Sequence, residues 1–331
     1  MTVLIAWNYD VSFYLKIVQE IPEKFAYPLI IMTPSASTDL HTDPRLFEGM
    51  DVYAVAGNPI SHSRSPLIHA KFAQQTQQAM HYGRLQPELG SFIRAAHDFF
   101  AAGGKGMNVT VPFKLDAKAF SDVLTPRAQL AGAVNTLWIR DEKIYGDNTD
   151  GAGLVRDLLA QGIALTGARI LLLGAGGAAR GVLGPLLEQS PKHLVIANRS
   201  SAKADELVTL MMDQAKMNNT ILESATLEGL EDSKKTAPFD LVINATAAGL
   251  DNQSPLSNVA AANVFVPSSF AYEMLYGKTS SFMHQALQRG ARVSDGLGML
   301  VEQAADAFLL WRGADLATSI DPRAVLAELR S

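Results

Sequence analysis

The 331-residue sequence has no cysteine, no long basic run and no long apolar run. Without cysteine the chain cannot form disulfides, use a thiolate nucleophile or hold a cysteine-ligated zinc ion, and its composition fits a reducing compartment, so we expect a cytoplasmic protein. The formal charge of −5 gives no general attraction to phosphate backbones or anionic lipids, which disfavours nucleic-acid and membrane-surface roles. The seven histidines are scattered and none belongs to a His-Glu-x-x-His pattern, so no metal site is expected.

Residues 1–49 differ from the rest of the chain, because aromatic and charged residues are mixed there without a clear period. The apolar run at 29–32 is far shorter than the roughly 20 residues that span a membrane. A basic start followed by a small-residue cleavage site is missing, so a secretion signal is not expected. Met50 directly precedes a strand-like run, and we therefore expect residues 1–49 to be an extension, either disordered or absent from a protein translated from Met50. A functional arm is the alternative.

From Met50 onward, apolar runs of strand length alternate with helical patterns, which is typical of an α/β protein with largely parallel sheets. The length of the chain and its 48% hydrophobic content suffice for two domains with cores of their own. The first series has strands at 53–57, 82–85 and 106–111, helices at 66–77 and 90–101, and a hairpin at 138–140 and 143–145. The second series follows a polar boundary at 146–151 and has strands at 169–173, 193–197, 240–244 and 270–273.

A short apolar strand ends in three polar side chains: the amide of Asn108, the hydroxyl of Thr110 and the ammonium of Lys114. Pro112 stops the strand, so Lys114 starts the next element at a place where a cleft can form. Amide and hydroxyl groups bind substrate hydroxyls, and the lysine supplies a charge and a proton. The alternative is an edge strand followed by a solvated lysine, which is a common arrangement.

A glycine-rich turn directly follows the apolar strand at 170–173 and opens an amphipathic helix. In a dinucleotide site the first glycine permits the tight turn, the second lets backbone amides approach the pyrophosphate, and the last alanine allows the helix to pack closely on the strand. A purely structural turn between strand and helix is the alternative. The run that we assign to the cofactor is Gly174-Ala175-Gly176-Gly177-Ala178, followed by Ala179.

The next strand of this series ends without the acidic residue that NAD sites usually place against the ribose 2′-hydroxyl. In its place stand groups that donate hydrogen bonds or carry positive charge: Asn198, Arg199, Ser200 and Lys203. A planar guanidinium binds a 2′-phosphate through two hydrogen bonds, so the cofactor that we predict is NADP. The alternative for Arg199 and Lys203 is the solvated, basic start of a helix.

Five runs of the sequence resemble the shikimate dehydrogenase family, in order and with compatible spacing from Met50 to the C-terminus. They lie at 57–66, 108–114, 131–136, 146–151 and 295–299. The resemblance implies the reversible reduction of 3-dehydroshikimate to shikimate with NADPH, a step of chorismate and aromatic amino-acid biosynthesis. It also implies a discontinuous α/β substrate domain, 50–150 with a returning helical segment at 296–331, on either side of a Rossmann-like, doubly wound NADP-binding domain at 151–295.

The resemblance assigns the chemistry to Lys114 and Asp150. In the family this pair is an acid-base dyad, in which the ammonium stabilises the developing alkoxide and passes a proton while a hydride moves from the nicotinamide. Ser63 and Ser65 match the serines that hold the substrate carboxylate at the start of a helix, where the helix dipole also favours an anion. For Ser65 the alternative is a plain N-cap before Pro66.

Further positions match residues that bind substrate or cofactor in the family. Asn108, Thr110 and Asn135 bind ring hydroxyls or position the dyad, with turn or strand-end hydrogen bonding as the alternative. One departure concerns Glu273, because the family often has aspartate there. A helix with an apolar stripe is expected at 298–311. The resemblance places two residues beside the substrate and three beside the cofactor: Tyr276 and Gln303, and Thr246, Met274 and Gly296.

Two alternatives share much of this pattern. An NAD-dependent quinate/shikimate dehydrogenase has the same scaffold and dyad, but the missing acid after the second strand argues against NAD. A non-catalytic sensor of shikimate-pathway ligands would not need both Lys114 and Asp150, and the sequence shows no DNA-binding segment. We therefore expect an enzyme whose partner is a small-molecule substrate and which acts as a monomer or homodimer.

Overall fold

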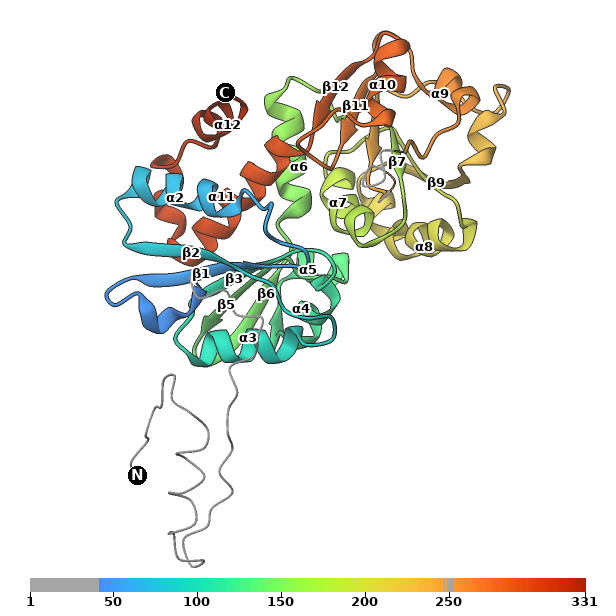
Figure 1. The fold of residues 1–331 in the computed structure, drawn as a ribbon. Helices are drawn as coiled ribbons and strands as arrows, with labels where there is room; N and C mark the ends of the chain where they lie inside the picture. Colours follow the sequence, from blue (N-terminus) through green and yellow to red (C-terminus); the bar gives the residue numbers. More distant parts are fainter. Residues whose placement is uncertain (1–41, 247, 249–252) are drawn as a thin grey trace, which may run out of the picture. The chain divides into compact units, whose positions relative to one another are not determined.

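The structure, a computed structural model, describes residues 42–246, 248 and 253–331 (Figure 1). Most of the expected extension, residues 1–41, therefore lies outside the described residues. The residues that come next in the chain pack against the first sheet. They form the short 3-10 turn η3 (Pro44–Leu46), after which the Phe47 ring stacks on His81 with the ring centroids 3.7 Å apart. Across the described residues, no helix combines the length and the apolar character that a membrane span requires.

In the described residues, two six-stranded sheets form the scaffold (Figure 1). Sheet A has the order β2 (Met80–Leu85), β1 (Asp51–Ala56), β3 (Gly106–Val109), β5 (Thr136–Arg140), β6 (Lys143–Asp147) and β4 (Val123–Leu124). Sheet B has the order β12 (Arg292–Asp295), β11 (Phe270–Glu273), β10 (Leu241–Asn244), β7 (Arg169–Leu173), β8 (His193–Asn198) and β9 (Ile221–Thr226). We call sheet A with its helices the first lobe and sheet B with its helices the second lobe.

The helices follow the strands in a regular alternation. Those connecting strands of sheet A are α2 (Ser65–Thr76), α3 (Phe92–Ala101), α4 (Lys114–Phe120) and α5 (Pro126–Ala131). Those connecting strands of sheet B are α7 (Gly177–Leu187), α8 (Ser201–Met217), the 3-10 turn η4 (Glu228–Glu231), α9 (Asn258–Val264) and α10 (Ser281–Gln288). The remaining helices are α6 (Asp150–Ala160) between the two sheets in sequence, and α11 (Leu297–Arg312), η6 (Ala314–Thr318) and α12 (Pro322–Arg330) at the end of the chain.

Sheet A is largely parallel, as expected, and β5 is the one reversed strand among those described. β1 pairs in parallel with β2 and β3, whereas β5 runs antiparallel to both β3 and β6. β5 and β6 form the expected hairpin, whose two turn residues, Asp141 and Glu142, have φ of 49° and 60°. β3 has partners on both sides, so the alternative of an edge strand is wrong. It also ends at Val109, two residues earlier than expected.

Sheet B is parallel throughout. Its strand order is that of a doubly wound, dinucleotide-binding sheet, in which the chain reverses direction of winding next to the first strand. The residues from Ile170 to Leu173 in β7 are completely buried, because separate apolar clusters cover the two faces of the sheet. Burial on both faces explains why the parallel strands read as continuous apolar runs.

Two long helices pack against each other, α6 after the first sheet and α11 after the second. They approach closely because α6 has a glycine at the crossing: a Cβ atom on Gly153 would lie 2.8 Å from the Cβ of Gln303 on α11. Another face of α11, together with α12, packs on α2 through a fully buried apolar cluster that includes Ile68, Phe72, Val301, Phe308 and Val325. The C-terminal helices therefore lie against the first lobe.

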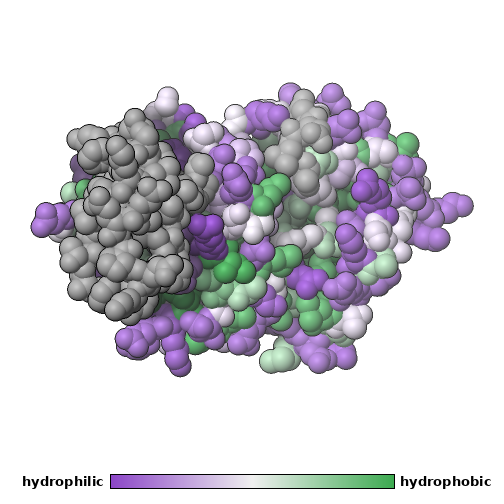
Figure 2. Space-filling view, turned by 60° about the horizontal axis from the view of Figure 1, so that its bottom comes forward, coloured by the Kyte–Doolittle hydropathy of each residue, from purple (hydrophilic) through white to green (hydrophobic). Residues whose placement is uncertain are grey.

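The surface is mixed in character. In the coloured part of Figure 2, hydrophilic residues cover most of the surface, and apolar side chains are seen near the centre of the view. Two of the exposed apolar side chains, Val111 and Leu115, lie on either side of Lys114 in the sequence, and each is 67% exposed. The start of α4 thus presents a lysine flanked by apolar groups.

Candidate active site

Lys114 and Asp150 are the first residues of α4 and α6. The lysine Nζ donates a hydrogen bond to Asp150 Oδ2 over 2.5 Å. Water reaches both groups only in part, since 22% of the Lys114 side chain and 10% of the Asp150 side chain are exposed. The residue before the lysine is anchored in the core, because the buried Phe113 ring stacks on Phe92 with a centroid distance of 5.3 Å. The structure thus brings the two predicted dyad residues into direct contact.

Asn135 connects Asp150 with Gln303. Its Nδ2 donates to Asp150 Oδ1 over 2.8 Å and lies 3.4 Å from Gln303 Oε1. The same nitrogen donates to Thr149 Oγ1 over 3.0 Å, and Asn135 Oδ1 accepts from the Thr149 amide over 2.9 Å. Asn135 follows α5 and Gln303 lies on α11, so three separate elements meet at one side-chain amide. The contact with Asp150 Oδ1 leaves the other carboxylate oxygen, Oδ2, facing the lysine.

Tyr82 belongs to this site although sequence analysis does not single it out. Its hydroxyl donates to Asn108 Oδ1 over 2.7 Å, and Asn108 Nδ2 donates to Thr136 Oγ1 over 3.1 Å. Burial raises the pKa of Tyr82 well above its usual value, and a hydrogen bond with Ser65 opposes this only in part. Tyr82 is therefore a neutral donor that orients the Asn108 amide. No local motif marks it, because the contact crosses from β2 to β3 over the intervening strand β1.

Ser63 and Ser65 are almost completely buried, at 7% and 4% exposure. α2 begins at Ser65 itself, with Arg64 as the N-cap and no side-chain capping hydrogen bond, so the interpretation of Ser65 as a plain N-cap is wrong. Instead, Ser63 Oγ accepts from the Ser65 amide over 3.3 Å, and the Ser65 hydroxyl contacts Tyr82. The two serines thus lie next to the network of Tyr82 and Asn108.

Thr110 is half-buried in the turn between β3 and α4. Its backbone amide donates to the Ala56 carbonyl over 2.9 Å, and its methyl group fills the space beside Gly57. A Cβ atom at Gly57 would lie 2.5 Å from that methyl group, so a side chain there would displace Thr110. The glycine after β1 therefore leaves room for the Thr110 side chain in the turn that leads to Lys114.

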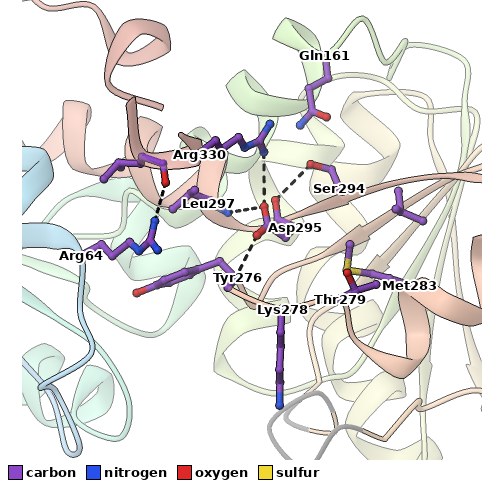
Figure 3. Close-up of a pocket in the computed structure, with 13 residues that line it drawn as sticks. Arg64, Gln161, Tyr276, Lys278, Thr279, Met283, Ser294, Asp295, Leu297 and Arg330 are labelled. Atoms are coloured by element: carbon purple, nitrogen blue, oxygen red, sulfur yellow. Dashed lines mark hydrogen bonds and ion pairs between the residues drawn. The ribbon is translucent and has the colours of Figure 1, made fainter. Parts of the chain in front are cut away.

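Tyr276 lies next to a cavity of about 460 Å³ (Figure 3). Its ring points toward the segment of Arg64, whose backbone hydrogen bonds to the Tyr276 hydroxyl and partly offsets the rise in pKa that burial causes. Arg64 stands between Ser63 and Ser65, so Tyr276 faces the serine segment from the second lobe. The dyad does not line this cavity, whose polar residues include Arg64, Lys278, Ser294, Asp295 and Arg330.

The glycine turn at the end of β7 has the geometry that a dinucleotide site needs. Gly174 has φ of 106°, and a Cβ atom there would approach the Ala245 carbonyl carbon to 3.2 Å. Among the described residues, Cβ atoms on Gly176 and Gly177 would meet nothing within 4 Å, so those residues leave space open before the first turn of α7. Ala179 is completely buried against the sheet. The turn therefore presents backbone amides and a helix N-terminus at the carboxyl edge of the sheet, where a phosphate can bind.

The residues predicted to bind a 2′-phosphate lie where β8 passes into α8, from the last residue of the strand to the first turn of the helix. Arg199, Ser200 and Lys203 are exposed. Asn198 has a structural contact in addition, because its Nδ2 donates to the Ser200 carbonyl over 3.0 Å and holds the turn. Positive charge is thus displayed at the end of the strand next to the glycine turn, where the adenosine ribose lies in doubly wound folds.

Glu273 holds together the ends of β10 and β11. It is 1% exposed and accepts hydrogen bonds from Asn244 Nδ2 over 2.8 Å and from Ser280 Oγ over 2.9 Å. Burial raises its pKa, and these hydrogen bonds act in the opposite direction. Asn244 Oδ1 in turn accepts from the Thr246 hydroxyl over 2.7 Å. Thr246, predicted on the cofactor side, is therefore positioned through Asn244 by this glutamate.

Met274 and Gly296 are brought together at the ends of β11 and β12. A Cβ atom on Gly296 would lie 2.7 Å from the backbone carbonyl carbon of Met274, so only glycine allows this approach. The Gly296 amide donates to the Leu275 carbonyl over 3.0 Å. The two residues therefore share the edge of sheet B that also carries the glycine turn and Thr246, the carboxyl edge at which ligands of such sheets bind.

Comparison with known families identifies both parts of the chain. Residues 55–137 match the family described as the substrate binding domain of shikimate dehydrogenase, and residues 157–252 match the family described as shikimate / quinate 5-dehydrogenase. The NADP(+) shikimate dehydrogenase of Vibrio atlanticus is 50% identical over 285 residues, which cover 85% of this chain and 97% of the relative. The enzyme of the same name from Methylobacillus flagellatus is 49% identical and is covered completely, with 85% of this chain.

Solved structures give the same result. Shikimate 5-dehydrogenase of Thermus thermophilus, in complex with NADP(H) and shikimate, superposes with a TM-score of 0.71 at 30% identity, over 84% of this chain and 98% of that chain. The Ael1 enzyme of Pseudomonas putida has a TM-score of 0.74 at 43% identity, with coverage of 84% and 98%. The resemblance seen in the sequence is confirmed, and the chain belongs to the shikimate dehydrogenase family.

Proposed function

We propose that this chain catalyses the reversible reduction of 3-dehydroshikimate to shikimate with NADPH, a step toward chorismate and the aromatic amino acids. The observation that carries the proposal is the 2.5 Å contact between Lys114 and Asp150, surrounded by Asn135 and Gln303. Membership in the family and the names of relatives that share half of the sequence support the same activity.

Lys114 acts as the proton donor and acceptor for the substrate oxygen. The carbonyl oxygen of the ketone gains negative charge as it is reduced, and the ammonium stabilises that charge and transfers a proton to it. Asp150 Oδ2 holds the lysine in place, while Asn135 binds Oδ1 and fixes the plane of the carboxylate. In the direction of oxidation the same groups remove the hydroxyl proton.

The surrounding polar groups suit a small acid with several hydroxyls. Ser63 and Ser65 bind the carboxylate at the start of α2, where the helix dipole adds to their hydroxyl donors. Tyr276 completes this end of the site from the second lobe. At the other end, Asn108 and Gln303 bind ring hydroxyls together with Thr110 and Asn135.

NADP fits the edge of sheet B, and when bound it supplies or accepts the hydride. The described residues leave space beside Gly176 and Gly177 that admits the pyrophosphate next to the amides of the turn. The exposed guanidinium of Arg199 and ammonium of Lys203 suit the 2′-phosphate. Thr246, Met274 and Gly296 lie on the nicotinamide side of this edge, where Glu273 and Asn244 fix the turns.

We extend the proposal to organisation and location. Residues 50–150 and 296–331 form the substrate domain, supported by the packing of α11 and α12 on α2, and residues 151–295 form the NADP-binding domain. The protein works in the cytoplasm, supported by the absence of cysteine, as a monomer or homodimer. Residues 1–49 are an extension to both domains.

The test follows the absorbance of the reduced nicotinamide with purified protein in four pairings: shikimate or quinate, each with NADP or NAD. We expect turnover with shikimate and NADP. Lys114→Ala should lose turnover about 10²-fold or more while it still binds NADP. Lys118→Ala is the matched control, because it removes the same group one turn further along α4.

Each other result selects a different function. Comparable activity with quinate or NAD would make the chain a quinate/shikimate dehydrogenase. If none of the four pairings gave turnover and the protein still bound shikimate, the chain would be a ligand sensor. Normal turnover of Lys114→Ala would remove the lysine from the mechanism even if the reaction is the one proposed.

A further inference from the structure

Arg127 on α5 contacts two carboxylates that belong to different parts of the active-site scaffold. Its Nε and Nη2 donate to Asp147 Oδ1 and Oδ2 over 2.7 and 2.6 Å, a two-point contact that a guanidinium makes with a carboxylate. Its Nη1 donates to Asp306 Oδ2 over 3.2 Å. The ion pairs are shielded, since the exposed side-chain fractions are 34% for Arg127, 2% for Asp147 and 15% for Asp306.

The first carboxylate, Asp147, ends β6 and organises the loop that carries Asp150. Its Oδ1 accepts from the Asn148 amide over 2.7 Å, and Asn148 Oδ1 accepts from the Asp150 amide over 3.2 Å. The Asp147 carbonyl also accepts from the amide of Asn135 over 2.9 Å. Fixing Asp147 therefore fixes both the dyad carboxylate and the asparagine that orients it.

The second carboxylate, Asp306, lies on α11 one turn after Gln303. Residues three apart lie on the same face of a helix, so the ion pair with Asp306 also constrains the rotation of α11 about its axis and the position of Gln303. Arg156 also binds Asp306, with Nη2 and Oδ1 2.5 Å apart, and ties it to α6. Arg127 thus joins the Asp150 loop to the helix that supplies the substrate-side glutamine.

Opposite charges and hydrogen bonds keep Asp147 ionised beside Arg127. Burial alone would raise the pKa of Asp147, but the Arg127 guanidinium, Thr125 and the Asn148 amide bring that pKa below its usual value. Thr125 Oγ1 donates to Asp147 Oδ1 over 2.5 Å. Among the described residues, Arg127 forms ion pairs with these two carboxylates, and Asp306 is also bound by Arg156.

We propose that Arg127 is a positioning residue for the reaction. It fixes the position of the Asp150 loop relative to Gln303. This inference rests on the proposed function. The two contacts of the guanidinium should affect different steps: the contact with Asp147 acts through Asp150 on turnover, and the contact with Asp306 acts through Gln303 on substrate binding. An ion pair with only a structural role would change stability without this division.

The experiment compares kcat and KM for Arg127→Met, Arg127→Lys and Asp306→Ala. Arg127→Met should lower kcat about 10²-fold, the cost of a small misplacement of a catalytic group, with the KM for NADP unchanged. Arg127→Lys restores the charge but not the two-point contact, so its loss of kcat should be about tenfold. Asp306→Ala should raise the KM and the Kd for shikimate about tenfold and leave kcat intact.

Arg140→Met is the matched control, because Arg140 lies on the neighbouring strand β5 and its side chain is 73% exposed. Melting temperature is measured for every variant; if Arg127→Met does not fold, Arg127→Lys and Asp306→Ala decide. Unchanged kcat in the folded Arg127 variants, or an equal rise in the KM for NADP and for shikimate, would overturn the inference while native turnover upholds the reaction. If the native protein is silent with all substrates, the proposed function fails, and calorimetric binding of shikimate to Asp306→Ala still tests the positioning of Gln303.

Discussion

Replacing His69 with glutamine should remove a large part of the acid sensitivity of this protein. His69 lies on α2 and is completely buried, with its ring stacked on Tyr82 at a centroid distance of 4.1 Å. Neither ring nitrogen has a hydrogen-bond partner of good geometry among the described residues. Burial lowers the pKa of the imidazole to about 3, and a weaker interaction with Asn108 acts in the opposite direction. The folded protein therefore keeps this histidine neutral far below the pH at which an exposed one is charged.

The size of the effect follows from the two pKa values. In the unfolded chain the imidazole takes up a proton below a pKa of about 6.5, whereas in the folded protein it does so only near 3. Protonation of the unfolded state draws the equilibrium toward unfolding. The contribution to stability is thus complete above pH 6.5 and is lost as the pH falls, by about 1.4 kcal/mol per pH unit, until about pH 3. Between pH 7 and pH 5 the loss from His69 alone is about 2 kcal/mol.

Urea unfolding at pH 7 and pH 5 measures this loss. Tryptophan fluorescence is a suitable signal, because the Trp311 ring lies 5.3 Å from the His69 ring. Between pH 7 and pH 5 the free energy of unfolding should fall in both proteins. The fall should be about 2 kcal/mol smaller in His69→Gln than in the native protein. His97→Gln, at a side chain that is 72% exposed, is the control and should keep the native pH dependence. The same fall in the native protein and in His69→Gln would show that His69 does not cause this acid sensitivity.

Two further predictions concern packing and cofactor choice. Gly153→Ala would place a Cβ atom 2.8 Å from the Gln303 Cβ, so α6 and α11 must separate. We expect the free energy of unfolding, measured with urea, to fall by about 1–3 kcal/mol and the KM for shikimate to rise. An unchanged urea midpoint would contradict the close packing. Arg199→Glu should raise the KM for NADP at least about tenfold and leave the KM for NAD nearly unchanged, because it sets a carboxylate against the 2′-phosphate. Equal rises for both cofactors in initial-rate assays would show that Arg199 does not distinguish them.

Strands buried on both faces could be predicted from sequence almost to the residue. β7 and β11 have the expected limits, because apolar clusters cover both faces of sheet B and their residues are hydrophobic except for Arg169 at the start of β7 and Glu273 at the end of β11. The edge strands β9 and β12 were missed, since their sequences, Ile-Leu-Glu-Ser-Ala-Thr and Arg-Val-Ser-Asp, alternate with polar residues or are too short to stand out. The two-residue strand β4 has no sequence signal at all. Its position depends on pairing with β6.

Sequence motifs indicate candidate site residues, but they do not show which of these residues contact one another. The dyad partners are 36 residues apart and Asn135 is 168 residues from Gln303, so their contacts follow from the fold rather than from local spacing. Tyr82 and Arg127 were missed for the same reason, because each acts through a partner on another element. Ser65 was open to a capping interpretation since Ser-Pro is a common helix start. The first helical turn begins one residue too early for that role.

The cluster formed by α2, α11 and α12 has a consequence for how the protein is made. Phe72 near the start of the chain packs on Phe308 near its end, with the ring centroids 5.7 Å apart. A ribosome that adds about 5–20 residues per second needs about 10 to 50 s to produce the second ring after the first. Sheet B and its helices lie within one continuous stretch and emerge complete during that interval. The first lobe, whose strands are synthesised first, therefore cannot complete its packing until α11 and α12 have been made.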